Sequence, residues 1–243
     1  MKNTISLQIN ALREVFILIS KGNFLKYFIP GIIVTLFFLL IQNFTTVDIE
    51  ESSNTTGWFS SILSKISTAF QFVMNQLYIF IILTVLSPIN TMLSEKLDTK
   101  ITGQKFKFSI VRLINDLIRM IFIVIIALIL QLVFISLWWI LARVLSINDS
   151  FIYTIVTFII SSFFFGFSFF DHSLERHEIS VSGSIKFAFS NKLTMILTGA
   201  IFNLLYYFPY FWKVSYFGII IAPVITTMVA TIVYLKIKNQ LLK

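Results

Sequence analysis

The sequence predicts an all-α integral membrane protein with two long spanning helices, two helix hairpins and interfacial amphipathic helices. Its 243 residues are 57% hydrophobic and only 12% charged, and the mean hydropathy is +0.90. An average soluble domain carries about 25% charged residues, so this chain has too little polar surface for a soluble globule. Several uncharged stretches also reach the about 20 residues that a spanning helix needs. We expect one membrane domain over residues 1–243.

The first half of the chain predicts one interfacial helix and two spanning helices. Residues 1–21 place apolar side chains at helical spacing opposite polar ones, which is typical of a helix lying in the membrane interface. The largely apolar segments 24–46 and 66–88 are long enough to span. Because proline lacks a backbone N–H, Pro88 is expected to end the second spanning helix. Residues 90–119 are expected to form a cytoplasmic amphipathic segment.

The second half predicts two helix hairpins, over 120–170 and 193–236, joined by a cytoplasmic loop at 171–192. At about 1.5 Å per residue, the helices of both hairpins are long enough to cross the bilayer. The second turn is very short, however, and Pro209 kinks or breaks the helix just before it. Full crossing and partial insertion therefore both remain open for each hairpin.

The distribution of Lys and Arg predicts that both termini are cytoplasmic. All but three of the 19 basic residues fall on one side of the predicted spans, the exceptions being Lys65, Arg143 and Lys213. Cytoplasmic loops carry such an excess, so the net charge of +8 reflects topology and headgroup contacts, with no nucleic-acid partner expected. The bias toward Lys, Asn, Ile and Phe is typical of an AT-rich bacterial gene, which predicts the bacterial inner membrane.

A polar stripe follows one face of the second spanning helix and its N-terminal extension. Its members are Ser64, Thr68, Gln71, Asn75 and Tyr78. Amide groups facing lipid would leave their hydrogen bonds unmade, so the stripe is expected to face protein or water. It either makes interhelical hydrogen bonds in a bundle or oligomer, or lines a pathway. Gln131 and Asn203 allow the same two interpretations.

No pattern in the sequence supports an enzyme, a metal site or a cofactor. The chain has no cysteine, and it lacks nucleotide-binding motifs and nucleophile–base arrangements. His172 and His177 are five residues apart and do not share a helix face, so a solvated loop is preferred there to a metal site. No ionisable residue lies near the centre of a predicted span, which argues against a proton pump.

Two short motifs carry a family resemblance through their order along the chain. The first is Leu86-Ser87-Pro88-Ile89-Asn90 with Glu95 behind it, and the second is Phe170-Asp171-His172-Ser173-Leu174-Glu175-Arg176. Pro209 and Pro223 follow at familiar spacings. Together they resemble the CysZ sulfate-permease family and the wider etoposide-induced membrane protein domain. The resemblance implies an oligomeric, all-helical inner-membrane protein that takes up sulfate.

The residues of these motifs suit structural roles. Once Pro88 has ended its helix, Ser87 or Asn90 is expected to cap the turn that follows. Asp171, Glu175 and Arg176 are expected to pair with one another or with the basic segment 96–119.

The anion-binding element of the family is a Gly-Leu-Arg-Arg run before a proline. Here the aligned run is Gly22-Asn23-Phe24-Leu25-Lys26 with Pro30 at the matching place, so Phe24 and Leu25 replace both arginines. The resemblance still implies an anion site at Lys21, Gly22 and Lys26, because a glycine turn and a helix N-terminus favour anions. Lysine lacks the bidentate grip of arginine, and headgroup anchoring is the alternative role of the two lysines.

Two functions follow from these observations. The first is a permease or channel-like protein that passes a small inorganic anion, with sulfate as the candidate, without its own energy source. The alternative is a non-transporting membrane scaffold or bilayer-shaping protein. In either case the expected partners are the lipid bilayer and further copies of the chain.

Overall fold

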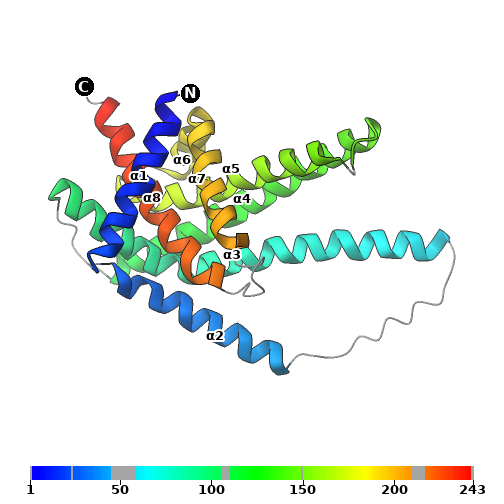
Figure 1. Ribbon diagram of the computed structural model, residues 1–243, viewed down its shortest axis with the longest axis horizontal. Coiled ribbons are helices and arrows are strands. Elements are labelled where there is room, and N and C mark those ends of the chain that lie inside the picture. The colour runs from blue at the N-terminus through cyan, green and yellow to red at the C-terminus, as the bar shows by residue number, and fades with distance from the viewer. Residues whose placement is uncertain are drawn as a thin grey trace.

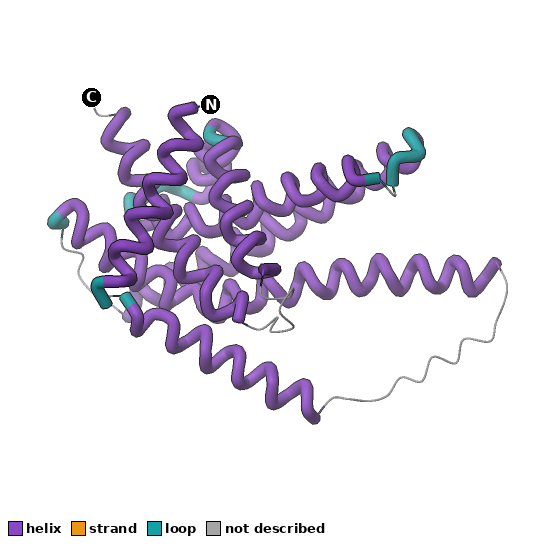
Figure 2. Tube along the Cα trace, in the orientation of Figure 1, coloured by secondary structure: helices purple, strands orange, loops and turns teal. Residues whose placement is uncertain are grey.

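The computed structural model describes residues 2–22, 24–44, 58–104, 110–148, 150–208 and 217–241. These residues are helical, with short turns and no strand (Figures 1 and 2). The elements in chain order are α1 (Lys2–Ser20), the 3-10 helix η1 (Leu25–Phe28), α2 (Ile29–Phe44), α3 (Trp58–Thr102), α4 (Ile110–Val144), α5 (Phe151–Arg176), α6 (Val181–Ser190), α7 (Lys192–Tyr207) and α8 (Phe217–Leu241).

The described helices confirm an all-α membrane fold. Four segments are long and apolar enough to cross a bilayer, namely Leu77–Thr102, Leu117–Val144, Phe151–Arg176 and Phe217–Asn239. Two bent helix pairs bring the number of candidate spans in the described residues to as many as six. These pairs are α1 with the η1–α2 segment, bent by 102°, and α6 with α7, bent by 94°. The protein is therefore a multi-pass membrane protein.

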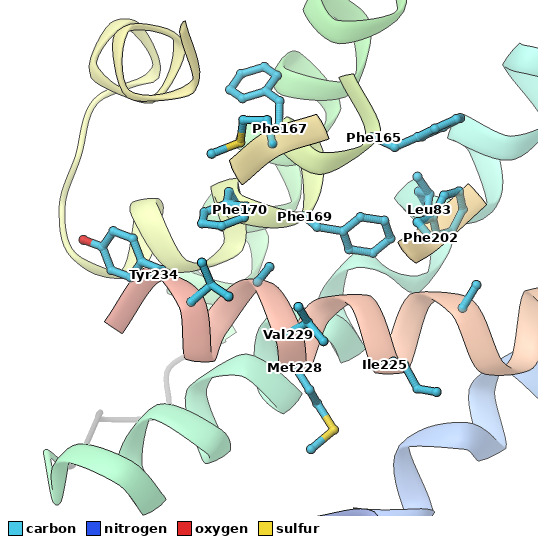
Figure 3. Close-up of a cluster of buried hydrophobic side chains, with 14 of the residues drawn as sticks. Leu83, Phe165, Phe167, Phe169, Phe170, Phe202, Ile225, Met228, Val229 and Tyr234 are labelled. Carbon is cyan, nitrogen blue, oxygen red and sulfur yellow. The ribbon is translucent and has the colours of Figure 1, made fainter. Parts of the chain in front are cut away.

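The core forms where α5, α7 and α8 meet. The side chains of α8 are buried without a break from Ala222 to Leu235, as expected for a helix that is apolar all round. Against α8 lies the phenylalanine-rich part of α5, whose Phe165 and Phe169 rings have centroids 4.9 and 5.1 Å from that of Phe202 on α7. Figure 3 shows these rings gathered above α8. Aromatic pairs at this spacing add to the apolar burial.

Two glycines allow α5 and α7 to cross at backbone contact. A Cβ atom added to Gly166 would overlap the backbone of Met195, and one added to Gly199 would overlap the backbone of Ser162. Small residues at such crossings are typical of membrane helices, because van der Waals packing replaces the hydrophobic drive for helices to associate.

Both hairpins expected from the sequence are present as neighbouring helices. α4 and α5 run side by side and project from the rest of the molecule (Figure 1). Near their tip, the Trp138 ring stacks on Tyr153 with 6.3 Å between centroids, and the indole N–H donates to the Tyr153 carbonyl. α7 packs against α8 in the second hairpin. The turn between them, with Pro209 and Lys213, lies outside the described residues.

The expectation that Pro88 ends its helix is wrong, because α3 continues through Pro88 to Thr102. Ser87 and Asn90 are consequently buried within the helix and are not capping residues. A proline is tolerated inside a membrane helix where neighbouring helices satisfy the backbone groups that it frees. Residues 90–102 thus extend α3, and α4 begins at Ile110.

The expectation of a solvated loop after Phe170 is also wrong. α5 continues to Arg176, and the side chains of Asp171, His172 and Ser173 are buried. The polar residues are accommodated because α3, α4 and α8 supply partners for them, as described below. The remainder of 171–192 is largely the short helix α6.

Candidate functional site

The predicted anion-binding residues lie in the turn between α1 and η1. Gly22 has φ +75°, a left-handed conformation that glycine adopts without strain, and its N–H donates to the Ile19 carbonyl at 2.8 Å. This glycine turn allows the sharp bend between the two helices. Lys21 and Lys26 flank it with exposed side chains, and Asn23 lies outside the described residues.

Phe24 anchors this turn to the core. Its side chain is fully buried, and the neighbouring Tyr27 is 7% exposed. The two rings have centroids 6.3 Å apart. Burying an aromatic side chain stabilises a fold by about 1.5–3 kcal/mol. Phe24 is therefore a packing contact beneath the turn.

A cation from a distant helix lies over the same ring. Lys100 on α3 places its Nζ 5.3 Å from the Phe24 ring centroid, while Lys26 Nζ lies 5.3 Å from the Tyr27 centroid. We call Lys21, Gly22, Lys26 and Lys100 the lysine site. Among the described residues, none of its three ammonium groups is in an ion pair. Such unpaired, exposed cations remain available to an anion.

Three charged residues and a histidine from α3, the end of α5 and α8 form a group that we call the ionic cluster, namely Asp98, Arg176, His177 and Lys238. Arg176 Nε lies 3.3 Å from Asp98 Oδ2, and both side chains are fully buried. His177 Nε2 lies 3.2 Å from the same carboxylate oxygen, and Lys238 Nζ lies 2.9 Å from His177 Nδ1. The cluster thus ties α3 to the end of α5 and to α8.

Hydroxyl groups extend this cluster through the core. Arg176 Nη2 donates to Ser94 Oγ at 2.6 Å and to Ser173 Oγ at 3.2 Å. Ser94 Oγ also lies 2.5 Å from Thr231 Oγ1 on α8. One turn earlier, Thr91 Oγ1 lies 3.1 Å from His172 Nδ1. Buried polar groups persist in a core when they are hydrogen-bonded in this way.

A second ion pair joins α4, α5 and α6. Arg119 makes a two-pronged contact with Asp171, from Nη2 to Oδ1 at 2.8 Å and from Nε to Oδ2 at 3.1 Å. The same guanidinium donates to Ser184 Oγ and to the Ile179 carbonyl. Asp171 and Arg176 thus both pair with side chains from 96–119, which is one of the two arrangements expected. Glu175 is half-buried in the last turn of α5.

The remaining predicted residues lie on α3 and α8. Thr68, Gln71 and Asn75 lie in α3, as does Ser64, but the side chains of all four are outside the described residues. Tyr78 is half-buried against Ile82, Leu86 and Ile219. Glu95 lies on α3 within electrostatic reach of Tyr27. Pro223 is buried inside α8.

Gln131 and Asn203 make interhelical hydrogen bonds. Gln131 Nε2 donates to Ser161 Oγ at 3.4 Å, and Asn203 Nδ2 donates to Ser162 Oγ at 3.0 Å. Both amides therefore link to α5, one from α4 and one from α7.

A family comparison covers the lysine site and most of the helices described here. The family described as Sulfate transporter CysZ/Etoposide-induced protein 2.4 matches residues 11–216. The chain belongs to this family. Among curated proteins, none matches the chain. Because the match spans the α1–η1 turn, both ion pairs from α5 and all of α7, it confirms the resemblance based on the sequence motifs.

Sequence reasoning missed Lys100, Asp98 and Arg119 as members of these groups. Lys100 lies far along the chain from Phe24, and the pairing expected between the end of α5 and segment 96–119 did not specify which residues of that segment would be the partners. A local signal existed only for Asp98, which lies one helical turn after Ser94 on the same face of α3. Their partners are set by how α3 and α4 pack, which hydropathy does not determine.

Proposed function

We propose that this protein is a permease that passes a small inorganic anion, with sulfate as the candidate, across the bacterial inner membrane without its own energy source. The observation that carries the proposal is the lysine site. Lys100 from α3 lies over the ring of Phe24, beside the glycine turn where the sequence resemblance implies an anion site. Membership of a family described as sulfate transporters supports transport of this kind of anion.

Electrostatics favour an anion at this site. Lys26 and Lys100 each lie over one ring of the Phe24–Tyr27 pair, so their charges are held near a common surface. Like charges placed together attract a counter-ion from solution. Lysines act as point charges and do not impose the planar, bidentate geometry of arginine. We therefore infer weaker discrimination among oxyanions than an arginine pair would provide.

The absence of an energy source rests on the sequence. It has no nucleotide-binding motif, and no charged residue lies near the centre of a predicted span. We also propose that both termini are cytoplasmic. This agrees with the basic residues of the loops and with the position of α1 beside the end of α8 (Figure 1), where Glu14 and Lys236 form an ion pair. The lysine site then faces the cytoplasm.

Sulfate uptake into proteoliposomes tests the proposal. We expect radiolabelled sulfate to enter vesicles containing the protein faster than empty vesicles. Lys100→Gln should slow this uptake about fivefold, because one unit charge at contact distance in water contributes about 1 kcal/mol. Lys96→Gln is the matched control, since Lys96 is an exposed lysine on the same helix. Equal rates for the two variants would remove Lys100 from the anion site.

The alternative function is a non-transporting membrane scaffold, which one feature of α1 favours. Its Ile9 and Phe16 side chains are 61% and 53% exposed, which suits a helix embedded in the membrane interface. The same vesicles discriminate between the two functions. If sulfate, thiosulfate, phosphate and chloride all enter at the rate of empty vesicles, the permease proposal is wrong and the scaffold is preferred.

A further inference from the structure

A pocket between the outer half of α5 and the end of α7 has no role in the function proposed above. Its volume is about 270 Å³, many times the about 30 Å³ that one water occupies in the liquid. Phe165 and Asn203 are buried at its base. Phe158 and Tyr207, which are 36% and 46% exposed, lie at its edge and leave it open to the surroundings of the hairpin.

The base of the pocket contains an unsatisfied polar atom. Asn203 is 2% exposed, and its Nδ2 donates to Ser162 Oγ. Its Oδ1 has no hydrogen-bond partner within the described residues. A buried carbonyl oxygen without a partner is costly, and it is more so at membrane depth, where lipid offers no donor. A donor from outside the described protein atoms is therefore expected in the pocket.

Hydroxyl groups line the wall above this atom. They belong to Tyr153, Thr154, Thr157, Ser161 and Tyr207. Ser161 Oγ accepts from Gln131, so its own O–H is available to another acceptor. These hydroxyls are set in a lining that is otherwise mostly apolar, and the Thr157 O–H already donates to the Tyr153 carbonyl. Water is therefore favoured by the unsatisfied Asn203 Oδ1, to which an acyl chain offers no donor. Ser161 lies about 15 Å along α5 from Phe151, close to the middle of a candidate span.

The mouth of the pocket lies at the start of a long helix. Tyr153 and Thr154 belong to the first turn of α5, where Ser150 caps the Tyr153 N–H. The N-terminus of a helix carries a partial positive charge. None of the residues that line the pocket is acidic. The electrostatic preference at the mouth is therefore for an anion over a cation.

We propose that this pocket is a water-filled vestibule that admits small hydrated anions to the interior of the membrane domain. Water donates to Asn203 Oδ1 at the base, and the hydroxyls of the wall donate to and accept from further waters. The admission of anions rests on the permease function proposed above, whereas the hydration of the pocket does not. An acyl chain or a side chain of a second copy are the competing occupants.

Thiol labelling tests the vestibule directly, because the chain has no native cysteine. Thr157→Cys places a thiol on the pocket wall. Ile155→Cys and Ile159→Cys are the matched controls, since these residues flank Thr157 on α5, are 40% and 39% exposed, and do not line the pocket. Each variant is reconstituted in proteoliposomes and treated with a sulfonate-bearing or a trimethylammonium-bearing methanethiosulfonate. Unreacted thiol is then counted with a polymer-linked maleimide in detergent.

We expect Thr157→Cys to react with the sulfonate reagent about tenfold or more faster than either control, because a thiol ionises in water and not in lipid. Thr154→Cys at the mouth serves as a second variant if Thr157→Cys does not elute as a single folded species. Rates as slow as the controls would overturn the proposal in favour of lipid or a partner chain. Fast rates at all three positions would overturn it too, since the whole hairpin face would then be in water.

The two reagents and a flux measurement separate this inference from the permease proposal. If Thr157→Cys reacted with the cationic reagent alone, the proposal that the vestibule admits anions would be wrong. Fast reaction with the sulfonate reagent in a protein that moves no sulfate would leave the vestibule in place while contradicting the permease function.

Discussion

The ionic cluster and the lysine site lie at neighbouring parts of α3, yet their charged groups differ in burial and in pairing. Asp98 and Arg176 are fully buried and paired. Lys26 and Lys100 are exposed and, among the described residues, lie over aromatic rings without a carboxylate partner. A buried charge must be paired because desolvation is expensive, whereas an exposed one can stay unpaired at little cost. The comparison separates charges that hold helices together from charges that remain free to bind a ligand.

The largest expected effect comes from unpairing the ionic cluster. Asp98→Ala leaves the Arg176 guanidinium buried beside no carboxylate, which typically costs about 3–5 kcal/mol. For a chain of this length we expect the melting temperature in detergent to fall by about 10 °C. Glu14→Ala is the control, because the Glu14–Lys236 pair is 39% and 37% exposed, and such pairs contribute about 0–1 kcal/mol. Equal shifts in the two variants would show that burial does not distinguish these pairs.

The Arg119–Asp171 pair is expected to be intermediate. The Arg119 side chain is 18% exposed and Asp171 is 3% exposed, so solvent reaches one partner. Arg119→Met keeps much of the side-chain volume and removes the hydrogen bonds to Asp171 and Ser184. A hydrogen bond to a charged group contributes about 1.5–3 kcal/mol, and solvent access to Arg119 reduces the contribution of the several bonds that are lost. A total loss of about 2 kcal/mol is therefore expected by thermal melting. A melting temperature unchanged from the wild type would mean that this pair is as weak as an exposed one.

A substitution in the lysine site should affect transport more than stability, unlike the substitutions in the two buried ion pairs. Lys100→Gln is expected to change stability by about 1 kcal/mol or less, the contribution of an exposed cation–π contact, while it slows sulfate uptake. Melting and uptake are measured on the same preparation, with Lys96→Gln beside it. A large loss of stability with unchanged uptake would assign Lys100 to the structural charges of the ionic cluster.

The smallest expected effect is that of ionic strength, which acts on exposed charges more than on buried ones. The Debye length falls from about 30 Å at 0.01 M to about 10 Å at 0.1 M ionic strength, so added sodium gluconate screens exposed charges more than buried ones. Sulfate uptake at subsaturating concentration should fall as salt rises, while the melting temperature changes little. If uptake is independent of salt, the exposed lysines do not recruit the anion.

Much of the fold was predictable from the sequence, because spanning helices and hairpins follow from local hydropathy. The two errors at Pro88 and at Asp171–Arg176 have a common origin. Each expectation relied on the intrinsic preference of the residue, proline to end a helix and charged residues to lie in solvent. In the folded protein, neighbouring helices provide the hydrogen-bond partners that these residues would otherwise find in water. Of the lysine site, Lys21, Gly22 and Lys26 were found through a family motif, but Lys100 was not.

The sequence by itself determined that the chain is a helical membrane protein, in what order its apolar segments follow, and which family motifs it carries. These are properties of composition and of short stretches, where the cost of placing a polar group in lipid acts residue by residue. Only the tertiary structure decided which charges are buried together and which ammonium group lies over Phe24. Ion pairs between residues such as Asp98 and Arg176 depend on the packing of whole helices, and no local pattern encodes that distance.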